Sequence, residues 1–251
     1  MDNIKIYVAA HQRFVLPSDI DLNIYIPIHC GKATYNLDSD RGKTGSKSIL
    51  PEIGDDTGDN ISKKNKYYSE LTAMYWIWKN DTTSDIVGLN HYRRFFAEND
   101  DDTLLLSKDT ILTNLKEYDC MVSSICYNNK NVFDNEHSVY HEYGRHHNLQ
   151  DMNKVLIVCS QLFPDIFPVF LEELTCSTII HYCNLLICSK KIFDEYCSFI
   201  FSILFKVEKM IDFDDPFYDS YQMRVCGFLA ERMLRPWLIY KGYTFKSQPI
   251  L

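Results

Sequence analysis

The hydrophobic and polar positions of the chain follow two periods, one typical of buried strands and the other of amphipathic helices. Continuous apolar runs, typical of strands buried on both faces, cover residues 5–10, 23–28, 85–89, 118–123 and 184–188. Apolar residues spaced three and four positions apart predict helices over residues 62–80, 107–116, 149–163, 190–211 and 221–234. Strands alternate with helices in the first half, and helices dominate the second. This order predicts an α/β sandwich with a helical C-terminal elaboration, folded as one domain.

The segment 58–96 holds the clearest helix of the chain and, after it, a short buried strand. The apolar stripe of this helix consists of Tyr67, Leu71, Met74, Tyr75 and Trp78. Ser62 is the expected N-cap, because the turn residues of 58–60 precede it. Helix breaks are expected further along the chain, where proline follows phenylalanine at residues 163–164 and 167–168.

Basic and aromatic side chains directly follow the strand over residues 85–89. Ligands of open α/β sheets bind outside the carboxyl ends of strands, so residues 91–94 (H-Y-R-R) are placed to contact a ligand. In the alternative interpretation, Arg93 and Arg94 are solvated charges and His91 is a hydrogen-bonded core histidine. The residues alone leave both interpretations open.

Two polar segments invite a metal-binding hypothesis. The long loop 31–57 and the turn after it carry Asp55, Asp56 and Asp59. The polar segment 127–150 carries four histidines, and imidazole is a common metal ligand. These histidines are His137, His141, His146 and His147. No spacing among them matches a zinc motif such as H-E-x-x-H, so turn roles for the acids and substrate or surface roles for the histidines are favoured.

Composition narrows the class of protein. The chain has 251 residues with a formal net charge of −8, which argues against nonspecific nucleic-acid binding because that requires a basic face. Its nine cysteines are scattered without a C-x-x-C pair, which favours buried reduced thiols in a cytoplasmic protein. No signal peptide is indicated, and the apolar run 192–207 is too short to span a bilayer.

Four motifs are specific enough to suggest a family. They are K-I-Y-V-A-A-H at residues 5–11, G-D-N-I-S-x-K-N-x-Y-Y-S-E-L-T-x-x-Y-W-x-W-K-N at 58–80, H-Y-R-R-F-F at 91–96 and Y-Q-x-R-x-x-G-F-L-A-E-R at 221–232. Together they resemble bacterial capsule, O-antigen and exopolysaccharide cluster proteins, long catalogued as a domain of unknown function. Members of that family are associated with galactofuranosyl transfer from UDP-galactofuranose. The resemblance spans the chain from Lys5 to about Trp237.

The resemblance implies a GT-A-like (Rossmann-like) nucleotide-sugar fold across residues 1–251. Residues 1 to about 125 would form the nucleotide-sugar half, and about 126 to 251 the acceptor and helical half. In many such enzymes a strand ends in Asp-x-Asp, which holds a divalent cation on the UDP diphosphate. Here His91-Tyr92-Arg93 occupies that place, so we expect fixed basic side chains to receive the leaving UDP, with no metal and no other cofactor.

The same resemblance implies inversion, because an α-linked donor would give a β-linked galactofuranose. Inversion requires one carboxylate to deprotonate the acceptor hydroxyl. Glu231 is favoured by the family motif, and Asp215 and Asp219, with the neighbouring Asp214, by their place before a late helix; the choice stays open.

Donor and acceptor contacts are predicted from the same blocks. The predicted donor contacts are Ala10, His11, Arg13, Asp59, Asn60, Lys64, His91, Tyr92, Arg93 and Arg94. The predicted acceptor or sugar contacts are Tyr140, His141, His146, His147, Gln222 and Arg224.

The implied acceptor is a growing glycan on a polyprenyl diphosphate, which places the protein in the cytoplasm, with peripheral contact at the inner face of the membrane. The sequence indicates no oligomeric state and no nucleic-acid partner. Three rival functions remain: a transferase using another UDP-hexose such as UDP-galactopyranose, a metal-dependent transferase or hydrolase, and a non-catalytic sugar-binding module of a polysaccharide assembly complex.

Overall fold

The computed structural model describes residues 3–36, 47–99, 104–127 and 137–251, and a seven-stranded sheet lies at its centre. The strands are β1 (Ile4–Ala10), β3 (Tyr25–His29), β5 (Ile53–Gly54), β6 (Ile86–His91), β7 (Cys120–Ser123), β10 (Leu186–Ser189) and β11 (Phe245–Gln248). Their spatial order is β11-β7-β10-β6-β1-β3-β5, and all run parallel except β10. The predicted α/β, GT-A-like architecture is confirmed.

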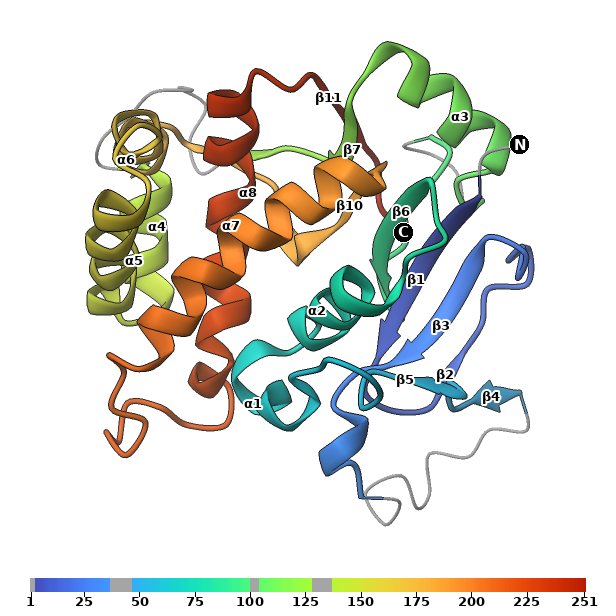
Figure 1. Cartoon of the computed structure of the whole chain (residues 1–251), viewed down its shortest axis with the longest axis horizontal. Helices are drawn as coiled ribbons and strands as arrows, with labels where there is room; N and C mark the ends of the chain where they lie inside the picture. The colour runs from blue at the N-terminus through green and yellow to red at the C-terminus, as the bar shows by residue number, and fades with distance from the viewer. Residues whose placement is uncertain (1–2, 37–46, 100–103, 128–136) are drawn as a thin grey trace.

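Helices cover the sheet, and two pairs of short strands lie outside it. The helices are α1 (Asn65–Tyr68), α2 (Leu71–Asn80), α3 (Lys108–Glu117), α4 (Val139–His146), α5 (Leu149–Leu162), α6 (Phe167–Thr175), α7 (Lys190–Glu208) and α8 (Val225–Lys241). The short strands pair β2 (Phe14–Val15) with β4 (Ser48–Ile49) and β8 (Cys126–Tyr127) with β9 (Ile179–Ile180). Figure 1 shows β1, β3 and β6 on the right, α4 to α6 on the left, and α7 and α8 between them.

The two faces of the sheet are buried in separate cores. Along β1, Tyr7 and Ala9 face the larger core, which α2, α7 and α8 complete, whereas Ile6 and Val8 face the smaller core beside α3. Burial on both faces explains why β1 appears in the sequence as an uninterrupted apolar run. Both halves of the chain build this one sheet, because β10 pairs with β6 and β7.

The helix predicted over residues 62–80 is broken in the structure. A 3-10 turn (Ser62–Lys64) and α1 precede Ser69, whose φ of 49° and ψ of −128° separate α1 from α2. The prediction of Ser62 as N-cap is wrong. Its hydroxyl instead accepts a hydrogen bond from the Ala33 amide at 3.0 Å and donates to Asp55, so it fastens the preceding loop.

The structure differs from the sequence predictions in several shorter helices and strands. The polar segment 127–150, of which 128–136 lie outside the described residues, contains α4, capped by Ser138. Pro164 follows the end of α5 as predicted, but Pro168 begins α6 rather than breaking a helix, because the first helical turn tolerates proline. The loop 31–57 contains β4 and β5, and β11 carries only one strongly apolar residue in F-K-S-Q.

Other sequence predictions are confirmed. Pro27 lies in β3 where β5 does not pair with it, because β5 pairs only with Ile28 and His29, so this proline without an amide proton sits at a free edge of the sheet. Residues 190–208 form the buried helix α7. Six of the nine cysteines are buried and all nine are free thiols. Within the described ranges, no helix is long and apolar enough to cross a bilayer.

A buried histidine connects the end of β7 to the strand pair β8–β9. The Nδ1 atom of His181 lies 2.6 Å from the Ser123 carbonyl oxygen and therefore carries the proton, while Nε2 has no hydrogen-bond partner among the described residues. Burial lowers the pKa of His181 from 6.5 to about 4.

We expect His181 to make the fold sensitive to acid. Between about pH 6.5 and pH 4 the unfolded chain binds a proton on this side chain that the folded chain does not, so stability falls as the pH falls through that range. Over this range the free energy of unfolding falls by about 3 kcal/mol. His181→Asn, which keeps a donor for Ser123 but does not titrate, should show a smaller loss, measured by urea unfolding at neutral pH and at about pH 4.5. An unchanged acid loss in His181→Asn, or an equal change in the exposed control His146→Asn, would contradict this.

Candidate active site

A cavity opens at the carboxyl ends of β1 and β6, where the strand order reverses. From β1 the sheet continues through β3 and β5 on one side and through β6 and β10 on the other. Such a switch point is the expected ligand crevice of an open α/β sheet. The cavity measures about 470 Å³, and its lining includes Ala9, His11, Ser69, Glu70, His91 and Arg224. We call it the first cavity.

Residues 91–94 form a tight turn at the rim of this cavity. The His91 amide donates to the Arg94 carbonyl at 2.9 Å, and the Arg94 amide donates to the His91 carbonyl at 3.0 Å. The Tyr92 amide donates to the Ala9 carbonyl at 3.0 Å, which ties the turn to β1. Arg93 and Arg94 are exposed, and within the described part of the chain no carboxylate pairs with either. Their charge is therefore available to an anion.

The imidazole of His91 lies at the same place but contributes no positive charge at neutral pH. Burial lowers its pKa; the Glu70 carboxylate opposes this shift, and the neighbouring arginines add to it. His91 therefore acts there as a neutral hydrogen-bonding group, and the arginines supply the charge.

A second cavity, of about 640 Å³, adjoins the first and lies between α4, α8 and the 3-10 turn Tyr182–Asn184. Five side chains line both cavities: Glu70, His91, Arg93, Arg94 and Arg224. The two cavities thus form one cleft with two lobes. Their common boundary carries three guanidinium groups, one imidazole and one carboxylate.

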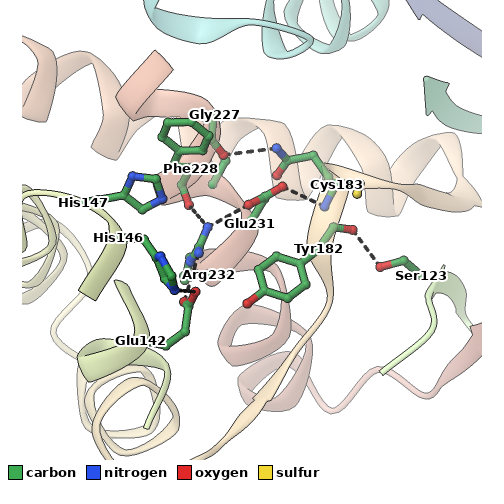
Figure 2. A network of polar contacts seen from close by, with 12 residues as sticks. Ser123, Glu142, His146, His147, Tyr182, Cys183, Gly227, Phe228, Glu231 and Arg232 are labelled. Carbon is green, nitrogen blue, oxygen red and sulfur yellow. Dashed lines mark hydrogen bonds and ion pairs between the residues drawn. The ribbon is translucent and has the colours of Figure 1, made fainter. Parts of the chain in front are cut away.

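A buried arginine organises the far wall of the second cavity (Figure 2). The Arg232 side chain is 2% exposed; it donates to Glu231 at 2.7 Å, to Glu142 at 3.0 Å and to the Phe228 carbonyl at 2.8 Å. The second oxygen of Glu231 accepts from the Cys183 amide at 2.8 Å. Burial raises the pKa of Glu231, although the charge of Arg232 opposes the shift.

Aromatic rings form another wall of the second cavity. The rings of His147 and Phe228 stack with centroids 4.2 Å apart, and Tyr221 lies 5.0 Å from Phe228. The Nδ1 of His147 lies 2.9 Å from the Gln222 side-chain oxygen, which fixes the ring. Aromatic faces combined with a few polar groups suit an amphipathic ligand such as a sugar ring.

The structure divides the predicted donor contacts into two groups. Those lining the first cavity are His11, His91, Tyr92, Arg93 and Arg94. The others, which lie outside its lining, are Ala10, Arg13, Asp59, Asn60 and Lys64. Lys64 pairs with Glu208 at 2.6 Å, and Asp59 accepts from the Tyr75 hydroxyl at 3.1 Å. Ala10 is wholly buried in the smaller core, and Ala9 lines the cavity instead.

Three of the predicted acceptor contacts, His146, His147 and Arg224, line the second cavity. Gln222 supports two of them, because it contacts the His147 ring and donates to the His146 carbonyl at 2.9 Å. Tyr140 and His141 do not line the cavity; the Tyr140 hydroxyl donates to Asn153 at 2.7 Å, and the His141 ring lies 3.1 Å from the Ser138 hydroxyl.

The candidate bases also separate. Glu231 lines the second cavity, whereas Asp215 and Asp219 line neither lobe and are exposed. Asp219 accepts from the amides of Tyr221 and Gln222 at 2.8 Å, and Asp215 accepts from the Phe217 amide at 2.9 Å. Both hold turns before α8. Asp214 is exposed in the same turn.

The proposed metal groups have other local roles. Asp55 is buried and accepts from the amides of Gly31 and Lys32 at 2.8 and 3.2 Å, in addition to Ser62. Within the described ranges, no three His, Cys, Asp or Glu side chains lie close enough together to hold one metal ion. Metal independence stays a prediction that a chelator can test.

Sequence reasoning assigned no role to Glu70, Glu142, Tyr182 or Arg232, all of which line the second cavity. Glu70 and Arg232 lie inside recognisable motifs, S-E-L and A-E-R, and that membership was the available signal. Nothing in their residue type distinguished them from exposed helical charges, because their role depends on contacts between distant segments.

The chain is similar to a known protein family and to a solved structure. The model of a family described as a domain of unknown function, DUF4422, matches residues 5–242. A solved structure, described as the apo structure of the bifunctional glycosyltransferase WbbM, is similar with a TM-score of 0.78 and 26% sequence identity over 99% of this chain. The match covers 45% of that chain, so the present chain spans less than half its length. No curated protein matches.

Removal of the buried guanidinium should be costly. Arg232→Met leaves the largely buried carboxylates of Glu142 and Glu231 without their guanidinium partner, and among the described residues only His146, 4.0 Å from Glu142, remains as a basic neighbour within ion-pair distance. We therefore expect a loss of about 3–5 kcal/mol in the free energy of unfolding. Urea unfolding measures this. The exposed control Arg145→Met should stay within about 0.5 kcal/mol of the wild type. A loss below about 1 kcal/mol in Arg232→Met would show that this network does not hold the cavity wall.

Proposed function

This chain belongs to the DUF4422 family, and on that premise we propose that it is a glycosyltransferase that moves a sugar from a UDP donor to a glycan acceptor. The observation that carries the proposal is the boundary between the two cavities. It places arginines and a carboxylate beside one another where two adjoining ligands would meet. Sugar transfer needs both groups there, one to stabilise the leaving diphosphate and one to accept the acceptor proton.

The first cavity would bind the donor. A nucleotide at the β1–β6 switch point would bring its diphosphate to the turn 91–94, where Arg93 and Arg94 lie. Guanidinium groups form paired hydrogen bonds with phosphate oxygens. They would stabilise the charge that gathers on UDP as the glycosidic bond breaks, and the neutral His91 would add a hydrogen bond.

The second cavity would bind the acceptor sugar. Its stacked Phe228 and His147 rings offer an apolar surface, and the polar groups beside Arg232 offer hydrogen bonds to hydroxyls. Acceptor and donor would then meet across Glu70, His91 and the boundary arginines. This arrangement permits direct displacement with inversion.

For the sugar itself we propose galactofuranose, transferred from UDP-galactofuranose to a polyprenyl-diphosphate-linked glycan in capsule, O-antigen or exopolysaccharide synthesis. The support is the family resemblance of the four sequence motifs. The similar structure is that of a bifunctional glycosyltransferase, which supports glycosyl transfer in general and leaves the sugar open. The lipid-linked acceptor would bring the protein to the inner face of the membrane.

A donor screen tests the proposed activity. Purified protein is incubated with a synthetic lipid-linked glycan and UDP-galactofuranose, UDP-galactopyranose or UDP-glucose, and the product is identified by mass spectrometry and NMR. We expect a β-linked galactofuranosyl product with the first donor only. Transfer from another donor would replace the sugar assignment, and UDP-sugar binding without turnover would support a non-catalytic module. Full activity in EDTA is expected; loss of activity restored by Mn²⁺ would favour the metal-dependent rival.

The proposed role of the turn 91–94 in stabilising the leaving diphosphate can be tested separately. Arg94→Ala should lower kcat by about 10²–10³-fold, because a preorganised charge at the leaving group would be lost. Steady-state kinetics with the preferred donor measure the change. Arg145→Ala, on the exposed side of α4, is the matched control and should leave kcat unchanged. An unchanged kcat in Arg94→Ala would remove this residue from the mechanism.

A further inference from the structure

Glu70 occupies a place in the cleft that no other described carboxylate shares. It lines both cavities, whereas Glu142 and Glu231 line only the second. A group that removes a proton from the acceptor while the donor bond breaks must reach the point where both ligands meet. Among the described carboxylates of the cleft, only Glu70 lies where it could reach both ligands.

The hydrogen bonds of Glu70 leave one of its oxygens available. Oε1 accepts from the Asn184 side-chain amide at 2.7 Å, and within the described part of the chain Oε2 has no hydrogen-bond donor and no basic side chain within ion-pair distance. Glu231 differs, because one oxygen is paired with Arg232 and the other accepts a backbone amide. Glu142 is paired with Arg232 as well. Both of these carboxylates are committed to the cavity wall.

Strained backbone surrounds Glu70. Three non-glycine residues have positive φ among the described residues, namely Ser69 (49°), Cys183 (76°) and Asn184 (52°). Ser69 directly precedes Glu70, Asn184 donates to it, and Cys183 donates to Glu231. Each such conformation costs about 1–3 kcal/mol, and residues of this kind gather at functional sites. The fold therefore sustains strain in order to place Glu70 and its partner.

A second contact holds the orienting amide. The Nδ2 group of Asn184 also donates to the Gly227 carbonyl in α8 at 3.2 Å. The Arg224 Nε donates to the Ser69 hydroxyl at 3.0 Å, which fixes the kink from the other side. Thus the Glu70 carboxylate is held by segments from three parts of the chain.

We propose that Glu70 is the catalytic base of the transfer, an inference that rests on the proposed function. Its Oε2 removes the proton of the acceptor hydroxyl as the hydroxyl oxygen forms a bond to the anomeric carbon. The bond between that carbon and the UDP oxygen breaks, and its electron pair leaves with UDP beside Arg93 and Arg94. Asn184 is a positioning residue, because it keeps Oε1 engaged and directs Oε2 to the boundary.

The experiment removes the carboxylate of Glu70 and, separately, replaces the acceptor hydroxyl by a nucleophile that has no proton to lose. Glu70→Gln should lower kcat for glycan transfer by about 10²–10⁴-fold, the contribution of a general base, while UDP affinity measured by calorimetry stays within about twofold of wild type. In Glu70→Ala, azide offered in place of the glycan should give a glycosyl azide, because azide attacks the anomeric carbon without losing a proton. Mass spectrometry detects this product.

Two further variants make the result specific. Glu172→Gln makes the same chemical change on the exposed face of α6 and should leave kcat unchanged. Glu231→Gln tests the rival base, and azide should not be used faster by Glu231→Ala than by the wild type. If the wild type transfers the sugar and the kcat of Glu70→Gln is within tenfold of the wild-type value, Glu70 is not the base, and the proposed function still stands. If Glu70→Ala gives no glycosyl azide, Glu70 has a structural role in the cleft and is not the catalytic base. No transfer by the wild type with any donor would overturn the proposed function and this inference with it.

Discussion

The close approach of α8 to the backbone kink at Ser69 is the contact on which the cleft depends. At Gly227, an added Cβ atom would lie 3.7 Å from the Ser69 side chain, an ordinary van der Waals distance, so the helix and the kink approach closely and still leave room for a small side chain. The contact joins the N-terminal strands and helices to the C-terminal helices. It also sets the boundary between the two cavities, because Arg224 and Glu70 lie on either side of it.

Charge in the cleft follows from this arrangement. The arginines of the turn 91–94 are exposed and lack carboxylate partners among the described residues, whereas Arg232 is buried and paired with two. The first kind suits a mobile anion, which can bind and depart. The second kind suits a wall, because a buried pair is costly to break. Arginine therefore has two roles around the second cavity. Arg93 and Arg94 are available to bind an anion, whereas Arg232 stabilises the wall.

The sequence was sufficient to predict features that depend on local periodicity. The buried strands β1 and β6, the buried helix α7 and the basic turn after β6 that lines the cleft all follow from apolar runs and from the polar residues that end them. It was insufficient where distant segments decide. The break at Ser69 is stabilised by Arg224, and the role of Glu70 depends on Asn184, 114 residues away. Asp215 and Asp219 looked equivalent to Glu231 until their turn contacts were known.

The antiparallel strand β10 has a consequence for how the molecule assembles. Because β10 lies between β6 and β7, those two strands cannot pair with each other, and the middle of the sheet stays open until residues 186–189 join it. On a ribosome, residues 186–189 must emerge before the main sheet can close. Until then β6 presents an unpaired apolar edge, so the nascent chain is exposed to misassociation while residues 92–185 are being added.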